Sequence, residues 1–117
     1  MRSAGQNMWE IIIYERIFVM IKHLDEKNFE KELENVALVD FYADWCGPCR
    51  TMSRIIEDFD RAHPEVIVAK VNIDESPALA ERFGVKSIPT LAFFKGGEVE
   101  SVNVGVMSMR SIEERML

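Results

Sequence analysis

The sequence predicts an α/β fold in which helices cover both faces of a central mixed β-sheet. Stretches of strand length alternate with stretches of helical period along the chain, and such alternation implies parallel crossover connections. The last two predicted strands are separated by Gly96-Gly97, a hairpin turn that makes them antiparallel. The predicted order is β-α-β-α-β-α-β-β-α, within one domain at 20–117.

The first elements of this domain are two strands and a helix. Residues 21–24 alternate apolar and polar side chains, which predicts a short strand. Asp25 can cap a helix that buries Phe29 and Leu33, four residues apart. Residues 36–42, VALVDFY, form a near-continuous apolar run that is typical of a central strand buried on both faces.

A long helix is predicted next, because the apolar residues after Pro48 recur at helical spacing: Met52, Ile55, Ile56 and Phe59. Residues 66–71, VIVAKV, predict a second buried strand. Ser76 is a predicted N-cap with Pro77 at the first helical position, and Gly84 ends that helix.

The C-terminal part of the domain is predicted to hold the hairpin and one more helix. Residues 90–94 are predicted to form a third strand, and residues 99–104 its antiparallel partner. Ser108 can cap a short last helix that buries Ile112 and Met116.

Composition argues against several classes of function. The chain has 117 residues and a net charge of −6. A nucleic-acid or anionic-membrane surface would need clustered Lys and Arg, so neither partner is expected. The two cysteines stand in one short motif, unlike the framework of a secreted disulfide-rich protein. We expect no bound cofactor and no metal.

Residues 1–19 stand outside the pattern of the domain. Glu10, Glu15 and Arg16 interrupt their apolar run, which fits neither a signal peptide nor a membrane span. Two interpretations remain open. The segment is either a non-essential extension before a usual start at Met20, or an amphipathic helix that covers a surface or pairs two chains.

The chemistry of the chain is expected at Cys46 and Cys49, in the run VDFYADWCGPCRTM. Cys46 ends a strand and opens a helix, where free backbone N–H groups and the helix dipole stabilise a thiolate. A thiolate attacks disulfide sulfur, and Cys49 lies one helical turn further on, close enough to attack the resulting mixed disulfide. Pro48 stiffens the link between the sulfurs, and Gly47 lets a substrate backbone approach.

Two other interpretations of the cysteine pair are weaker. A zinc site needs four ligands, and the histidines, His23 and His63, stand alone at no ligand spacing. A structural disulfide across so short a loop would remove little chain entropy. A CxxC motif between a strand and a helix in an α/β chain instead favours redox chemistry.

The motif WCGPC, at 45–49, resembles the active site of the thioredoxin family. The segments LVDFYADWCGPC, VAKVNID, FGVKSIPTLAFFKGGE and VGV also resemble thioredoxin segments, in family order, so the likeness runs from about residue 21 to 117. It implies the thioredoxin fold. Two positions depart from the family pattern: Arg54 replaces a usual helix proline, and Tyr42 stands where a second tryptophan is frequent.

The resemblance also implies roles for individual residues. Cys46 would be the exposed attacking nucleophile and Cys49 the resolving cysteine, with Trp45 shielding the pair and bordering the substrate groove. Asp40 would be a buried carboxylate beneath Cys49, with Lys70 as its buried partner on the next strand. A buried acid has a raised pKa and is a suitable base for Cys49, so Asp40 is expected to accept its proton.

The same resemblance implies a groove for the substrate. Pro89 would be a cis proline that faces the disulfide, and Ile88 would offer backbone hydrogen bonds to an extended substrate segment. Gly105 would keep the far wall of the groove open. Gly47 and Pro48 would also contact the substrate.

The resulting hypothesis is a protein-disulfide reductase that works by dithiol–disulfide exchange. Its partners would be disulfide-containing client proteins and a thioredoxin reductase, in a role of electron transport and cell redox homeostasis. The Gly-Pro between the cysteines resembles the reducing members of the family, and the lack of a convincing signal peptide implies the cytoplasm. A monomer or weak dimer is expected. The alternatives are a binding module or subunit with a secondary redox role, and an oxidase or disulfide isomerase.

Overall fold

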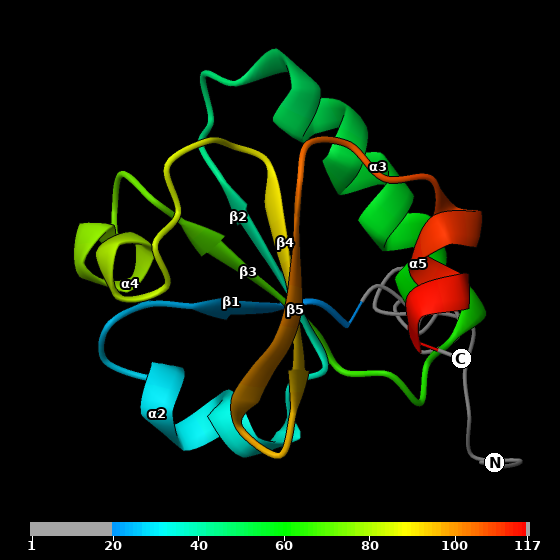
Figure 1. Cartoon of the computed structure of the whole chain (residues 1–117), viewed down its shortest axis with the longest axis horizontal. Helices are drawn as coiled ribbons and strands as arrows, with labels where there is room; N and C mark the ends of the chain where they lie inside the picture. The colour runs from blue at the N-terminus through cyan, green and yellow to red at the C-terminus, as the bar shows by residue number, and fades with distance from the viewer. Residues whose placement is uncertain (1–19, 117) are drawn as a thin grey trace, which may run out of the picture.

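The computed structural model describes residues 20–116, which form a mixed five-stranded sheet with helices on both faces (Figure 1). The elements in chain order are β1 Lys22–Leu24, α2 Phe29–Glu32, the 3-10 helix η1 Leu33–Asn35, β2 Leu38–Tyr42, α3 Gly47–Ala62, β3 Val68–Asn72, α4 Pro77–Arg82, β4 Thr90–Lys95, β5 Glu98–Val104 and α5 Met109–Met116. The predicted fold class and element order are confirmed. The expectations for residues 1–19 lie outside the described residues.

The strands lie in the order β1-β3-β2-β4-β5. The strands β1, β3 and β2 are parallel to one another, and β4 and β5 add the antiparallel side. Because β2 has neighbours on both sides and helices above and below, its first four residues are completely buried. This explains why residues 36–42 read as a continuous apolar run.

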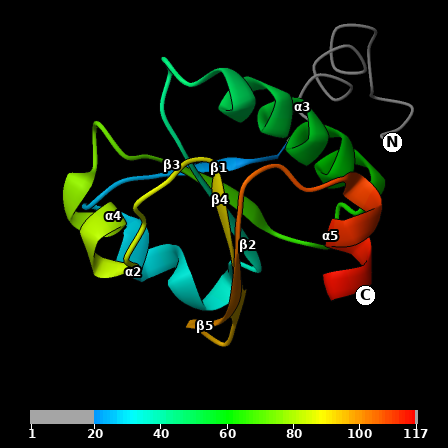
Figure 2. The same cartoon turned by 45° about the horizontal axis from the view of Figure 1, so that its top comes forward.

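Each face of the sheet has its own hydrophobic core. The helices α3 and α5 cover one face and α2 and α4 cover the other (Figure 2). Side chains alternate between faces along β2. Leu38 packs with Met52 and Phe59 of α3, whereas Val39 and Phe41 pack on the side of α2 and α4. Asp40 therefore belongs to the face that α3 covers.

The predicted helix ends are mostly confirmed by their hydrogen bonds. Gly84 has a φ of +66°, and the N–H of Val85 donates to the carbonyl of Ala80 at 2.9 Å, which closes α4 in a left-handed turn. The N–H of Ser111 donates to the Ser108 hydroxyl at 3.1 Å, so Ser108 caps α5.

Two local expectations need correction. Asp25 does accept hydrogen bonds from the backbone N–H groups of Lys27 and Asn28, but α2 begins only at Phe29 and is four residues long. Ser76 stands at the N-cap of α4, yet its side chain makes no capping hydrogen bond; Pro77 begins the helix there. No helix within residues 20–116 is long and apolar enough to cross a membrane.

Candidate active site

The cysteine pair lies at the junction of β2 and α3, at the upper end of the molecule in Figure 1. Cys46 is the N-cap of α3, and its backbone is extended rather than helical. The backbone N–H of Cys49 donates to the Cys46 sulfur at 3.2 Å. A sulfur in this place accepts a hydrogen bond from one of the free N–H groups at the helix start and lies at the positive end of the helix dipole. Both effects favour the thiolate form of Cys46 after reduction.

Cys46 and Cys49 are joined by a disulfide, and their Cα atoms are 5.2 Å apart. The expectation that Cys46 is exposed is wrong for this oxidised form, in which Cys46 is 5% exposed and Cys49 2% exposed. The reason is packing, because the pair forms a small apolar cluster with Ala43. Three half-buried side chains border this cluster: Tyr42, Ile73 and Ile88.

The loop before β4 faces the disulfide from the opposite side. The Ile88–Pro89 peptide bond is cis, as the resemblance implied. The carbonyl oxygen of Ile88 lies 3.9 Å from the Cys46 sulfur. The carbonyl of Pro89 accepts a hydrogen bond from the N–H of Gly105 at 2.8 Å, which ties this loop to the segment after β5. The structure therefore brings Ile88, Pro89 and Gly105 together beside the cysteines.

The side of the disulfide formed by Trp45, Gly47 and Pro48 is open to solvent. Beyond its chain neighbours and the backbone of its own helix turn, a Cβ added at Gly47 would meet no atom of the described residues within 4 Å, and Pro48 is exposed. Trp45 is 68% exposed, although its indole N–H donates to the Asp74 carboxylate at 2.8 Å. Asp74 thus fixes the direction of a large side chain that would otherwise rotate freely beside Cys46.

Asp40 is completely buried in β2, on the face that α3 covers. Within residues 20–116, neither of its carboxylate oxygens has a hydrogen-bond partner. Burial raises the pKa of this carboxyl from its ordinary value of 3.8 to about 7, against a smaller opposing effect of the Lys70 charge. The expectation of a buried acid with a raised pKa is confirmed.

Lys70 does not form the expected buried pair with Asp40. The two residues are register partners on β2 and β3, but Lys70 is only half-buried, and no ion pair joins them in the described part of the chain. The Lys70 ammonium instead donates to the Ser53 hydroxyl at 2.6 Å and lies 4.4 Å from the centre of the Tyr42 ring. Because the lysine stem is long and flexible, the ammonium can lie at Ser53 and Tyr42 instead of at the buried Asp40 carboxyl.

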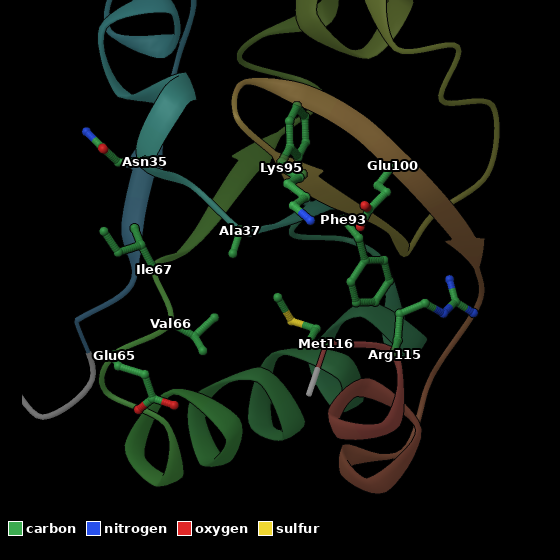
Figure 3. A pocket seen from close by; sticks show the side chains of 11 residues that line it. Asn35, Ala37, Glu65, Val66, Ile67, Phe93, Lys95, Glu100, Arg115 and Met116 are labelled. Atoms are coloured by element: carbon green, nitrogen blue, oxygen red, sulfur yellow. The ribbon is translucent and has the colours of Figure 1, made fainter.

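Two hollows are relevant to the choice of site. One of about 190 Å³ lies directly beside the pair and is lined by Tyr42, Ala43, Asp44, Cys49 and Arg50. A larger one of about 380 Å³ lies between the segment before β3, the β4–β5 hairpin and the end of α5, where Figure 3 shows Phe93, Glu100 and Arg115 on one side and Val66 and Ile67 on the other. Neither cysteine lines this larger hollow, whereas Cys49 lines the smaller one. Of the two, the smaller hollow is therefore the one that adjoins the reactive pair.

Three contributors to the site were not predicted as such. The spacing of Ser53 could have indicated it, because Ser53 stands four residues after Cys49 and so lies on the same face of the long helix. The sequence marks Tyr42 only as a departure from the family pattern. Asp74 follows a strand in a polar turn, and nothing in its spacing indicates that it would meet Trp45. Residues 20–116 hold no group of three His, Cys, Asp or Glu side chains that could bind a metal ion.

A cysteine pair in a disulfide, with one sulfur at a helix N-terminus and a cis proline opposite, defines a thiol–disulfide oxidoreductase. The family model described as thioredoxin matches residues 20–117, and the chain belongs to the thioredoxin family. With its redox-active pair in place, it is a protein-disulfide reductase.

Similar proteins span nearly the whole domain. A thioredoxin of Alicyclobacillus acidocaldarius subsp. acidocaldarius is 42% identical over 96 residues, which cover 80% of this chain and 91% of that protein. A thioredoxin of Rickettsia bellii is 39% identical, over 81% of this chain and 94% of its own. A chain from a structural study of thiol resolution in yeast mitochondrial 1-Cys peroxiredoxin via glutathione/thioredoxin systems superposes with a TM-score of 0.74. It is 27% identical and covers 85% of this chain and 95% of that chain.

Proposed function

We propose that the protein reduces disulfides of client proteins in two exchange steps. The Cys46 thiolate attacks a client sulfur, which forms a mixed disulfide and releases one client thiol. Cys49 then attacks the Cys46 sulfur, which releases the second client thiol and leaves the Cys46–Cys49 disulfide. Two electrons pass from the dithiol to the client. The observation that carries this order is the hydrogen bond from the Cys49 N–H to the Cys46 sulfur at 3.2 Å, since it favours Cys46 as the thiolate.

The second step requires Cys49 to lose its proton, and Asp40 is the proposed acceptor. Its carboxyl faces the helix that carries Cys49, and its pKa near 7 suits a base at neutral pH. The hollow of about 190 Å³ that Cys49 helps to line gives solvent access to the resolving cysteine.

The loops around the pair form the proposed client groove. Within residues 20–116, no hydrogen bond uses the backbone N–H of Ile88, so it is free to pair with an extended client segment. Pro89 and Gly105 form the wall beside it, and Gly47 and Pro48 leave space over the sulfurs. Trp45, held by Asp74, would border the groove and shield the pair.

The proposed setting is the reducing cytoplasm, where disulfides persist only as transient catalytic intermediates. A thioredoxin reductase would return two electrons to the Cys46–Cys49 disulfide, so the protein would serve electron transport and cell redox homeostasis. We expect a monomer or weak dimer.

Reduction of insulin disulfides with dithiothreitol as electron source tests this function. The wild type should catalyse it, and Cys46→Ser should abolish it. Cys49→Ser should accumulate covalent mixed disulfides with clients, because the resolving sulfur is gone. A wild type without activity would favour a binding module, and a redox potential far more oxidising than that of a reductant would favour an isomerase. Failure of Cys49→Ser to trap clients would contradict the order of attack.

A further inference from the structure

Lys70 and Asp40 are placed so that they could form an ion pair, yet they do not. They are register partners on adjacent parallel strands, and both side chains belong to the face under α3. Strands of one sheet lie only about 5 Å apart, so a lysine stem of this length reaches the carboxyl without any backbone movement. Distance between the strands therefore does not explain why the Asp40 carboxyl has no ion-pair partner among the described residues.

Two residues hold the lysine elsewhere. The Ser53 hydroxyl, one turn after Cys49 on α3, accepts a hydrogen bond from the Lys70 ammonium at 2.6 Å. The ring of Tyr42 lies 4.4 Å from the same ammonium and gives it a cation–π contact. Both partners come from elements that position the cysteines, since Tyr42 ends β2 and Ser53 belongs to α3.

We propose that Ser53 is a positioning residue that holds the Lys70 ammonium away from Asp40, so that the carboxyl stays unpaired and available to take the proton of Cys49. The inference rests on the proposed role of Asp40 as the base. A lysine paired directly with Asp40 would favour the carboxylate and make it a weaker base. A charge-assisted hydrogen bond to a hydroxyl satisfies the lysine without that effect.

Lys70 is the charged side chain near Asp40 that acts on the pKa of its carboxyl. On β3 the facing ionisable side chain is Lys70 itself, and on β2 the phenol of Tyr42 stands two residues further along the same face. The strand β4 presents the apolar Leu91 opposite Asp40, and α3 presents Cys49 and Ser53. Among the described residues, Lys70 is the charged group whose field acts on this carboxyl.

The test compares Ser53→Ala, which removes the hydroxyl, with Ser53→Thr, which keeps it. The first readout is the titration midpoint of the Asp40 carboxyl, followed by carbon NMR in the oxidised protein. Ser53→Ala should release Lys70 toward Asp40 and lower this midpoint by about one pH unit. Ser53→Thr should restore the wild-type midpoint. An unchanged midpoint in Ser53→Ala would overturn the inference.

A second background separates positioning from mere packing. With Lys70→Met in place, Ser53→Ala should no longer move the Asp40 midpoint, because no ammonium remains to be released. A shift of the same size in that background would overturn the inference, since Ser53 would then act on Asp40 without the lysine.

The second readout is the pH profile of the resolving step, measured from a preformed mixed disulfide. Its midpoint should move down with the Asp40 midpoint in Ser53→Ala. If the carboxyl midpoint moves and the rate profile does not, the proposed role of Asp40 as base fails while the role of Ser53 in holding Lys70 stands. The two failures are thus distinguishable.

Discussion

A buried aspartate lies near each end of α3, and the two differ in whether the carboxylate has a hydrogen-bond partner. Near the N-terminal end, Asp40 of β2 is completely buried on the face that α3 covers, and its oxygens have no partner within residues 20–116. Near the C-terminal end, Asp60 is 2% exposed and accepts a hydrogen bond from the backbone N–H of Met20 at 2.6 Å. Burial raises the pKa of both carboxyls, and at Asp60 the Met20 N–H partly offsets it.

The difference indicates which end is built for stability. The C-terminal end of α3 also holds His63, whose ring nitrogen lies 2.6 Å from the Glu113 carboxylate of α5 and whose ring packs on Phe59. The contacts of Asp60 with Met20 and of His63 with Glu113 each join this end of α3 to another segment of the chain. At the N-terminal end an unpaired acid is retained although it costs stability, which is the pattern expected where a group serves chemistry.

The largest effect is expected from Asp40→Asn in the oxidised protein. Raising the pKa of a carboxyl from 3.8 to about 7 costs the folded state about 4 kcal/mol once the group is ionised. The amide cannot ionise but is itself buried, so we expect a net gain of roughly 2 kcal/mol in unfolding free energy at pH 8. Urea unfolding at several pH values measures it.

The sign of the pH dependence follows from the raised pKa. Protonated Asp40 stabilises the fold fully below pH 4, and this stabilisation is lost as the pH rises through about 7. The advantage of Asp40→Asn at pH 8 should therefore shrink as the pH falls and become a disadvantage of roughly 2 kcal/mol at pH 3, where the wild-type carboxyl is protonated. An advantage that is equal at both pH values would show that Asp40 is not buried in its protonated form.

Asp60→Ala should have the opposite sign and a smaller size. It leaves the half-buried N–H of Met20 without its acceptor, which costs about 1–2 kcal/mol. Asp60→Asn is the matched control, because its amide oxygen can still accept this hydrogen bond and it lacks the charge that burial disfavours, so it should lose no stability. Thermal unfolding at pH 7 compares the two variants, and equal losses would contradict the assigned contact.

His63→Ala should have the smallest effect of the three. It removes the contact with Glu113 and the packing on Phe59, for an expected loss of about 1 kcal/mol. Glu65→Gln changes only a 3.7 Å contact at the exposed side of the same ring and should lose less than about 0.5 kcal/mol. Comparable losses in both variants would show that the α3–α5 contact is not what His63 provides.

The fold was predictable because its local signals agree with its tertiary structure. The apolar run at 36–42 is a central strand, and Gly96-Gly97 is a turn in which both φ angles are positive. The helix at α2 was predicted too long, because a pair of apolar residues four apart also fits one turn followed by a 3-10 turn.

The site was predictable only where the residues are consecutive or match the family motif. Cys46, Cys49 and the cis bond at Pro89 were expected, and so was the burial of Asp40. The direction of the Lys70 side chain was not, because register places two strands side by side but does not decide which partner a flexible ammonium chooses.

The central claim is that buried, unpaired Asp40 takes the proton of Cys49, and one measurement tests it most directly. A mixed disulfide between Cys46 and a chromogenic thiol is formed, and release of that thiol by Cys49 is followed from pH 5 to pH 10. The wild-type rate should rise with a midpoint near 7, the pKa of Asp40, whereas Asp40→Asn should be about 10²-fold slower near neutral pH and rise only as the thiol itself ionises. Superimposable profiles for the two proteins would contradict the account.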